Sequence, residues 1–203
     1  MIELSNEGID RVRSSVSYTL SANVEELVLT GSLAIDGIGN ELDNRLVGND
    51  ADNALYGGIG KDILNGRGGD DILIGGEGND VYIMGHGYGV ETIVENDATV
   101  GNMDAVRFLP GISTGQIWFQ RMDDNLEISI IGTSDKLVVN NWYLDSAYQI
   151  EQFRTADGMT LYNSQVDGLV DAMANFAPLG IGEITMPMDY AQVLDPVITA
   201  LWL

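Results

Sequence analysis

The chain has 203 residues, of which 31 are acidic and 9 are basic, and its formal charge at neutral pH is −22. This charge argues against nucleic acids and anionic membrane surfaces as partners, because both are bound through basic patches. The absence of cysteine excludes disulfides, a thiol nucleophile and a cysteine zinc site. A compact chain with this charge repels itself unless cations screen it, and each bound Ca²⁺ would offset two of the charges.

The sequence contains no run of about 18 consecutive apolar residues, so it predicts no transmembrane helix. Residues 1–7 are acidic and lack the cationic and apolar regions of a Sec signal peptide. Their pattern is typical of a β-strand that is present from the first residue. We therefore expect that upstream domains of a longer protein precede them.

Residues 9–37 are predicted to form short strands separated by turns, because apolar and polar residues alternate there. The alternating apolar positions are Val16, Tyr18, Leu20, Leu27 and Leu29. We expect these strands to form the first coils of a solenoid that continues in the next segment.

Three consecutive nine-residue units fill residues 57–83 and follow the pattern G-G-x-G-x-D-x-U-x, in which U is a large apolar residue. The glycines permit sharp turns and leave carbonyl oxygens free to face inward. The apolar residue at the eighth position lies on a short strand and fills a narrow core. The sixth-position carboxylates of Asp62, Asp71 and Asp80 are hard oxygen ligands suited to Ca²⁺.

The nine-residue period continues upstream in a weaker form. Gly39 and Gly48 hold the first position of two further units, and Asn44 and Asn53 hold the sixth. Asparagine offers a carbonyl oxygen but no charge, so we expect these turns to bind Ca²⁺ less tightly. A flexible glycine-rich linker would have no reason to place an apolar residue at every ninth position.

Two other types of site fit this sequence poorly. A phosphate-binding loop is disfavoured because Asp70, Asp71, Glu77 and Asp80 would repel a phosphate, and no G-K-[ST] follows. The single histidine, His86, has no second histidine with which to share a metal, and no G-x-S-x-G elbow is present for a catalytic triad. We interpret His86 as a loop residue.

From about residue 94 the glycine period stops and an ordinary β pattern begins. The predicted strands span residues 105–109, 117–120, 126–131, 136–140 and 150–155. We expect this segment to close the open end of the solenoid, because an uncapped end exposes strand edges. Its aromatic residues are expected in the core or cap, with a sugar-binding platform as the alternative. These residues are Trp118, Phe119, Trp142, Tyr143 and Phe153.

The end of the chain is predicted to contain a helix with Ser164 as its N-cap, and Pro178 is expected to end it. Its apolar face comprises Val166, Leu169, Val170, Met173 and Phe176. Residues 178–203 contain no lysine or arginine and end in an acidic residue followed by an apolar run. Two interpretations of this tail stay open, a secretion signal and a final strand that docks on the core.

These features together resemble the C-terminal end of an RTX (repeats-in-toxin) protein, a class exported by type I secretion systems. The haemolysin-type calcium-binding repeats cover residues 39–83. Residues 23–31, 87–93 and 141–158 resemble segments that flank such repeats, and the last of them resembles the haemolysin-type calcium-binding-related domain.

The resemblance implies an all-β fold in which the repeats form a parallel β-roll, a type of β-solenoid. We therefore predict a β-solenoid over residues 1–95, a β-rich capping domain over residues 96–163, and a helix with a secretion-signal tail over residues 164–203.

The resemblance also implies which atoms hold Ca²⁺ between each turn and the next turn but one. The earlier turn supplies its second and fourth carbonyls and its sixth side chain, and the later turn supplies its first and third carbonyls and its sixth side chain. The strongest site combines Gly58, Gly60 and Asp62 with Gly75, Glu77 and Asp80. A second combines Asn49, Ala51 and Asn53 with Gly66, Gly68 and Asp71. A third combines Asn40, Leu42 and Asn44 with Gly57, Ile59 and Asp62.

A fourth implied site departs from the pattern. It would combine Arg67, Gly69 and Asp71 with Met84 and His86. Its later turn has Gly89 at the sixth position and so lacks a carboxylate, for which Glu91 is the nearest replacement.

The sequence therefore predicts a secreted calcium-binding module that folds on Ca²⁺ outside the cell and interacts with the type I secretion machinery. It is not expected to be an enzyme. The alternative is an extracellular solenoid or adhesin module that binds a ligand such as a polysaccharide or ice. Catalysis on acidic polysaccharides is the least favoured function, because such substrates call for a basic cleft.

Overall fold

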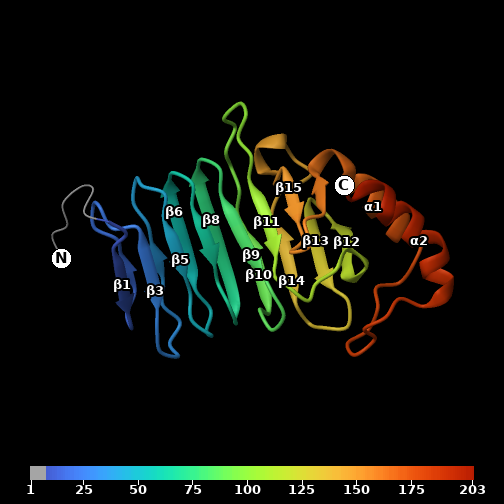
Figure 1. Ribbon diagram of the computed structural model, residues 1–203, viewed down its shortest axis with the longest axis horizontal. Coiled ribbons are helices and arrows are strands. Elements are labelled where there is room, and N and C mark those ends of the chain that lie inside the picture. Colours follow the sequence, from blue (N-terminus) through green and yellow to red (C-terminus); the bar gives the residue numbers. More distant parts are fainter. Residues whose placement is uncertain (1–7) are drawn as a thin grey trace.

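A computed structural model describes residues 8–203 of the protein, and the strand expected in residues 1–7 lies outside this range. The described chain is mostly β, with two eight-stranded sheets and two α-helices (Figure 1). Neither helix is long and apolar enough to cross a membrane. The N-terminal coils lie at one end of an elongated molecule and the helices lie at the other (Figure 1).

Each sheet is assembled from strands that are not consecutive in the chain. In spatial order, the first sheet contains β1 (Arg11–Ser14), β3 (Glu26–Leu29), β5 (Arg45–Val47), β7 (Ile63–Asn65), β9 (Val81–Met84), β11 (Ala105–Phe108), β15 (Gln152–Arg154) and β16 (Thr160–Tyr162). The second sheet contains β2 (Tyr18–Thr19), β4 (Gly37–Ile38), β6 (Ala54–Ile59), β8 (Asp70–Glu77), β10 (Val90–Ile93), β14 (Lys136–Val139), β13 (Asn125–Ile130) and β12 (Ile117–Met122).

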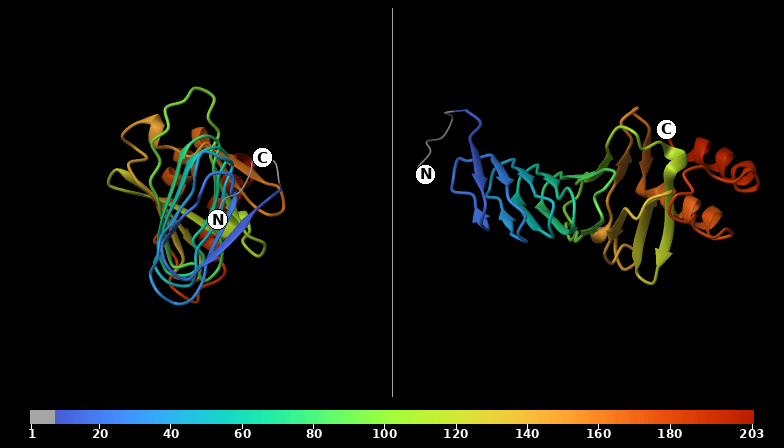
Figure 2. Two further views of the ribbon diagram at one scale, coloured as in Figure 1. Left: turned by 90° about the vertical axis from the view of Figure 1, so that its left-hand side faces the viewer. Right: turned by 90° about the horizontal axis from the view of Figure 1, so that it is seen from below.

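Up to β11, consecutive strands alternate between the two sheets, and neighbours within a sheet are parallel. Within the repeats, positions two units apart are register partners, as for Leu46 with Leu64 and Leu55 with Leu73. The eighth-position residues thereby stack between the sheets, where they are fully buried. Viewed end-on, the early coils superimpose as one flattened loop (Figure 2). The nine-residue spacing of apolar residues therefore forms the core of this part of the molecule.

Both sheets continue without a break past residue 95. Strand β11 pairs in parallel with β9 and β15, and β14 pairs in parallel with β10. The chain then reverses direction, because β12, β13 and β14 form an antiparallel meander and β16 pairs antiparallel with β15. The domain boundary near residue 95 stays a prediction. In the structure, the segment that follows the repeats extends the same two sheets.

The five strands predicted in this region correspond to β11, β12, β13, β14 and β15, with ends shifted by one or two residues. Strand β16 was not predicted from the sequence, because its three residues are too few to show an alternating pattern. The aromatic residues predicted for the core include Trp118, Phe119, Trp142 and Phe153, each at most 2% exposed. These four rings are not available as a sugar-stacking surface.

The predicted helix is α1, Asn163–Met173, which begins one residue before Ser164. The amide of the preceding residue, Tyr162, donates to Gln165 Oε1 at 2.9 Å, so the first turn is capped without Ser164. Val166, Leu169 and Met173 are buried on the predicted apolar face.

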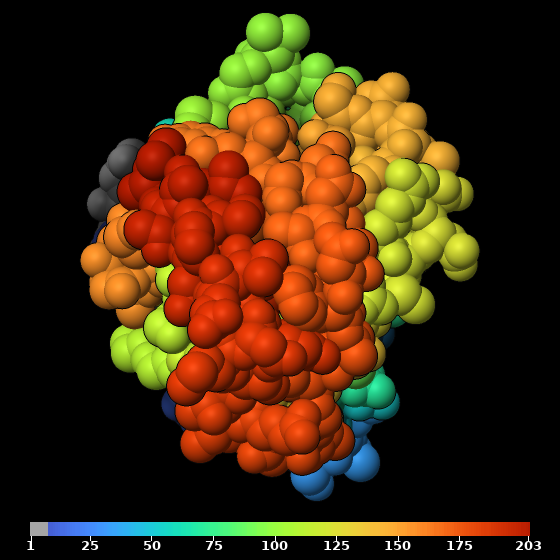
Figure 3. All heavy atoms as spheres, turned by 90° about the vertical axis from the view of Figure 1, so that its right-hand side faces the viewer, coloured from blue at the N-terminus to red at the C-terminus, as the bar shows by residue number. Residues whose placement is uncertain are grey.

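A final strand was one interpretation of the tail, and it is wrong. Residues Met188–Leu201 form a second helix, α2, which buries Leu194 and Ile198. The apolar residues of the tail fall at helical spacing from Tyr190 to Leu201, and this period favours a helix over an extended strand. The two helices and the loop between them cover this end of the molecule (Figure 3).

Candidate metal centre

The repeat turns lie in two rows, one along each edge where the chain crosses between the sheets. The first row contains residues 39–44, 57–62 and 75–80, which lead from the second sheet to the first. The second row contains residues 48–53 and 66–71, which lead back. Each sixth-position side chain therefore stacks on the equivalent side chain of the next coil.

In the first row, backbone amides connect the sixth-position residues to one another. The amide of Asn44 donates to Asp62 Oδ1 at 2.7 Å, and the amide of Asp62 donates to Asp80 Oδ1 at 2.8 Å. In the second row the amide of Asn53 donates to Asp71 Oδ1 at 2.7 Å. One oxygen of each aspartate is thus satisfied by the preceding coil.

The other oxygen of each aspartate has no partner. Asp62, Asp71 and Asp80 are at most 1% exposed, and the Oδ2 atom of each accepts no hydrogen bond from residues 8–203. Burial raises the pKa of Asp62 to about 7, and those of Asp71 and Asp80 to about 6. No lysine or arginine of the described chain pairs with them. Buried carboxylate oxygens without donors are costly, and a bound cation would satisfy them.

A first-position glycine creates space beside each of these side chains. In front of the Gly57 Cα, Asp62 Oδ2 and the Gly75 carbonyl oxygen converge where a Cβ atom would lie. At Gly39, the same space is taken by Asn44 Oδ1 and the carbonyl oxygen of Gly57. At Gly48, it is taken by Asn53 Oδ1 and the carbonyl oxygen of Gly66. A side-chain oxygen and a carbonyl of the next turn therefore meet in each of these repeats.

The second and fourth carbonyls of the 57–62 turn face the next turn of the first row. The Gly58 carbonyl lies against Gly76 and the Gly60 carbonyl lies against Gly78, so that no Cβ fits at either position. The carbonyl of Glu77 accepts a hydrogen bond from the Gly60 amide at 2.9 Å, while the Glu77 side chain is exposed. The residues predicted for the strongest site are thus neighbours. The Glu77 carbonyl, one of the predicted ligands, already accepts one hydrogen bond.

In the turns that contain asparagine, side-chain amides donate hydrogen bonds to the preceding coil. Asn53 Nδ2 donates to the Ile35 carbonyl at 2.7 Å, and Asn49 Nδ2 donates to the Leu33 carbonyl at 2.9 Å. In the first row, Asn40 Nδ2 donates to the carbonyls of Ser21 and Val24, at 2.9 and 2.8 Å. These amides occupy carbonyls of the preceding coil, so the asparagine turns contact that coil without a cation.

The remaining predicted ligands of these turns lie along the same two rows. The Leu42 carbonyl lies against Gly60, and the Ala51 carbonyl lies against Gly69. The Ile59 amide donates to the Asn40 carbonyl at 3.4 Å. Gly68 lies near Asp50 and leaves room for a Cβ atom, and Arg67 has a positive φ of 79°.

The fourth implied site is built differently from the expectation. Strand β10 pairs with β8 so that Glu91, and not Gly89, lies beside Asp71. Two extra residues enter the turn before β10, and counting in nines therefore points to the wrong residue. Met84 lies in β9, where it pairs with Phe108, and His86 lies in the exposed turn, as predicted for a loop residue.

The first row also extends beyond the repeats, which the sequence analysis missed. The Asp80 amide donates to Asp104 Oδ1 at 2.7 Å, and the Asp104 amide donates to Glu151 Oε2 at 2.7 Å. Burial raises the pKa of Asp104 to about 8. The separation of Asp80 from Asp104 along the chain is no multiple of nine, so it left no periodic signal in the sequence.

Among residues 8–203, no three His, Asp or Glu side chains gather in a geometry that could hold a metal ion. A Ca²⁺ ion here would therefore take two carboxylates at most and fill its six to eight positions largely with backbone carbonyls. The paired aspartates, the converging glycine carbonyls and the unpartnered Oδ2 atoms fit such an ion.

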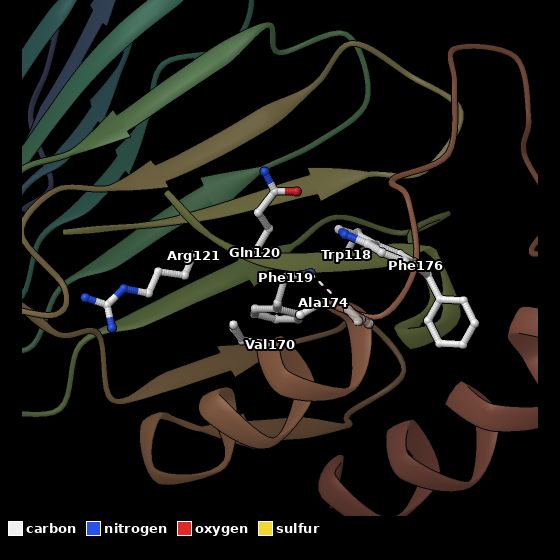
Figure 4. Close-up of a pocket in the computed structure, with 8 residues that line it drawn as sticks. Trp118, Phe119, Gln120, Arg121, Val170, Ala174 and Phe176 are labelled. Atoms are coloured by element: carbon white, nitrogen blue, oxygen red, sulfur yellow. Dashed lines mark hydrogen bonds between the residues drawn. The ribbon is translucent and has the colours of Figure 1, made fainter. Parts of the chain in front are cut away.

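An apolar hollow of about 230 Å³ lies between β12 and α1, away from the repeat turns (Figure 4). Its lining includes Trp118, Phe119, Val170 and Met173. Arg121 is its only ionisable lining residue and points away from the aromatic rings that line the hollow (Figure 4). The Arg121 guanidinium instead lies over the ring of Tyr143, 4.2 Å from its centroid. Within the described range 8–203, the lining of the hollow includes no carboxylate, histidine or nucleophile that could perform acid–base or covalent chemistry.

Comparison with protein families identifies two segments of the chain. A family model described as the RTX calcium-binding nonapeptide repeat matches residues 38–73 and 47–82. A second, described as the haemolysin-type calcium binding protein related domain, matches residues 125–165. Both resemblances predicted from the sequence are confirmed, and the repeats are of a kind that binds Ca²⁺.

Proposed function

We propose that this RTX-family protein is a calcium-driven folding module that supports type I secretion of a larger extracellular protein. One observation carries the proposal. Three buried aspartates, Asp62 and Asp80 in the first row of turns and Asp71 in the second, each leave an oxygen without a donor, beside glycine carbonyls that a cation could share.

The proposed mechanism depends on the calcium concentration on the two sides of the membrane. Without Ca²⁺, folding must bury Asp62, Asp71 and Asp80 with unpartnered oxygens in a chain of charge −22. The chain then stays unfolded and fits an export channel. Extracellular calcium modules bind in the range of roughly 0.1–1 mM. After export, the free energy of binding becomes free energy of folding.

We infer further that the repeats form a parallel β-roll. The inference is supported by the parallel pairing within each sheet, the alternation of consecutive strands between sheets, and the constant register from one coil to the next. Each Ca²⁺ would then lie between two turns of one row. The chain's own residues would orient the carboxylates through backbone amides and exclude water by packing the eighth-position residues.

Circular dichroism in chelator and in millimolar Ca²⁺ tests the proposal. We expect a weak β signal in chelator and a cooperative gain of β structure with Ca²⁺. Mg²⁺ should substitute poorly because it demands near-ideal octahedral geometry. Identical spectra with and without Ca²⁺ would contradict a calcium-driven fold.

A further inference from the structure

The charges of the chain are distributed unevenly between its surfaces. The described strands of the first sheet contain five of the nine basic residues and one of the 31 acidic residues. The basic residues are Arg11, Arg13, Arg45, Arg107 and Arg154, and the acidic residue is Glu26. A net charge of −22 is therefore compatible with one sheet on which arginine predominates.

These arginines lie on the outer face of the first sheet, because successive residues of a strand point to opposite faces. In β11 and β15 the arginines are next to Val106 and Phe153, which are fully buried and belong to the core. Arg107 and Arg154 are exposed and are register partners on neighbouring strands. The outer face extends from β1 to β15 along the length of the molecule (Figure 1).

Most of these arginines have no carboxylate partner. Arg11 pairs with Glu26, but no carboxylate within residues 8–203 forms an ion pair with any of the other four. Like charges that are directly opposite each other on neighbouring strands destabilise a sheet. An anion placed between Arg107 and Arg154 would relieve this repulsion.

The guanidinium of Arg154 is already oriented by its neighbour. Its Nε atom donates to Oε1 of Gln152 at 2.6 Å, and Gln152 is buried. A guanidinium group has five N–H donors, so those that do not contact Gln152 can meet a carboxylate. A side chain that is held in its binding orientation before the ligand arrives loses less entropy on binding.

The arginines are too widely spaced for one small anion to reach them all. Neighbouring strands of a sheet are about 4.8 Å apart, so Arg13 in β1 and Arg107 in β11, which are five strands apart, are separated by roughly 24 Å. Half-buried neutral side chains such as Val28 and Ile63 lie between them on the outer face. A long chain with spaced negative charges and apolar patches fits this surface.

We propose that the outer face of the first sheet binds a linear polysaccharide that contains carboxylate groups, with Arg107 and Arg154 as the main contact point. Arginine binds carboxylates through two parallel hydrogen bonds. An acidic peptide fits less well, because peptides that bind to sheets add to a free strand edge through backbone hydrogen bonds, and this face offers side chains only. Nucleic acids have a denser charge and would be repelled more strongly by the rest of the chain.

This inference goes beyond the proposed calcium function, and the two can be tested separately. Binding of a hyaluronan oligosaccharide, which has a carboxylate on alternate sugars, is measured by fluorescence polarisation at a fixed millimolar Ca²⁺ concentration. A neutral chitin oligosaccharide of the same length should not bind, and oligoglutamate should bind more weakly than hyaluronan. The proposal is overturned if hyaluronan does not bind or if oligoglutamate binds at least as tightly.

A pair of double variants tests the position of the site. Arg107→Gln with Arg154→Gln should weaken hyaluronan binding roughly tenfold or more, through the loss of charge-assisted hydrogen bonds. Arg121→Gln with Lys136→Gln is the matched control, because it removes the same charge from strands of the second sheet and should leave the affinity nearly unchanged. Equal losses in both double variants would show that only the net charge matters and would overturn the site.

Chemical modification of the unaltered protein provides a second measurement in case the first double variant folds poorly. Phenylglyoxal modifies exposed arginines, and mass spectrometry locates the modified residues. Bound hyaluronan should protect Arg107 and Arg154 and leave the modification of Arg121 unchanged. Equal modification of Arg107 and Arg154 with and without hyaluronan would contradict binding at this face.

Discussion

At the scale of single residues, aspartate and asparagine solve the same burial problem in different ways. Asn53 is buried and its amide donates to the carbonyl of Ile35 in the preceding coil. Asp71, one coil later in the same row, has no such donor and leaves Oδ2 unpartnered. The change from asparagine to aspartate along the chain therefore divides the coils into an early part, in which side-chain amides bond to the preceding coil, and a later part with buried oxygens that a cation could satisfy.

Replacing aspartates of the strongest site should weaken Ca²⁺ binding most. Asp62→Ala and Asp80→Ala each remove one of two carboxylates, whereas Asn44→Ala removes a neutral side chain. Because each aspartate variant removes a charged ligand, we expect its Ca²⁺ affinity to fall by roughly tenfold or more. Asn44→Ala should cause a smaller loss. Titration calorimetry on the three variants measures this, and the largest loss in Asn44→Ala would show that the turns are paired differently.

Converting an asparagine turn should extend the calcium requirement. Asn53→Asp loses the amide hydrogen bond to Ile35 and buries a further charge, so it should be destabilised by about 1–3 kcal/mol at a Ca²⁺ concentration just sufficient to fold the unaltered protein. A large excess of Ca²⁺ should restore most of this stability. Thermal unfolding at the low and the high Ca²⁺ concentration compares the two; equal destabilisation at both would mean that the turn gained no cation.

The buried aspartates also predict how the calcium-free protein responds to pH. Their pKa values rise on folding, from 3.8 to about 7 for Asp62 and about 6 for Asp71 and Asp80. A group whose folded pKa is the higher one stabilises the fold below its unfolded pKa, and this contribution is lost as pH rises through the folded value. In chelator, folding should therefore become less favourable between about pH 4 and pH 7, so the β structure that is weak at pH 7 should increase as the pH falls. Circular dichroism in chelator at several pH values measures it, and less β structure at pH 4 than at pH 7 would contradict the burial of these groups.

At the scale of elements, the turns depend on glycines that allow adjacent coils to approach. Gly78 has a φ of 138°, and a Cβ there would collide with the carbonyl of Gly60 in the coil before. By contrast, Gly115 has no atom within 4 Å of its Cβ position and no positive φ. Glycine is therefore a structural requirement at Gly78 and a replaceable residue at Gly115.

These two glycines form a matched test of the turn geometry. Gly78→Ala should cost about 1–3 kcal/mol from backbone strain alone and should weaken Ca²⁺ binding, because the carbonyl of Gly60 must move. Gly115→Ala should change neither stability nor binding appreciably. Unfolding curves and calcium titrations of both variants decide the matter, and a neutral Gly78→Ala would argue against close stacking of the coils.

At the scale of the whole molecule, the tail closes the end opposite the N-terminal coils. Leu194, Ile198 and Trp202 are buried, and the amide of Leu203 donates to the carbonyl of Thr160 at 2.9 Å. The same tail contains no lysine or arginine, and in the proposed secretion it would be extended in the export channel before it folds. A structural role and a sorting role can therefore belong to one segment at different times.

Deleting residues 178–203 should abolish export of a passenger through a matching type I system. Every proposed Ca²⁺ ligand precedes residue 92, so the truncated chain should still bind Ca²⁺, although the loss of packing should lower its stability. Leu194→Ala in the full-length chain is the control, because it should cost about 2–5 kcal/mol at a buried site without removing the tail. Normal export of the truncated protein would leave the tail with its packing role alone.

The sequence by itself determined the repeats and their chemistry. A strict period of nine places Asp62 and Asp80 in one row and Leu64 and Tyr82 in one core stack, because all coils of the repeats have the same length. Only the tertiary structure decided what happens where that period ends. The register of β10 on β8 brings Glu91 to Asp71, and the path to β11 brings Asp104 to Asp80. The reason is physical: pairing between strands is set by the hydrogen bonds and packing of the whole sheet, which absorb extra residues in the turns and so hide these contacts from any count along the chain.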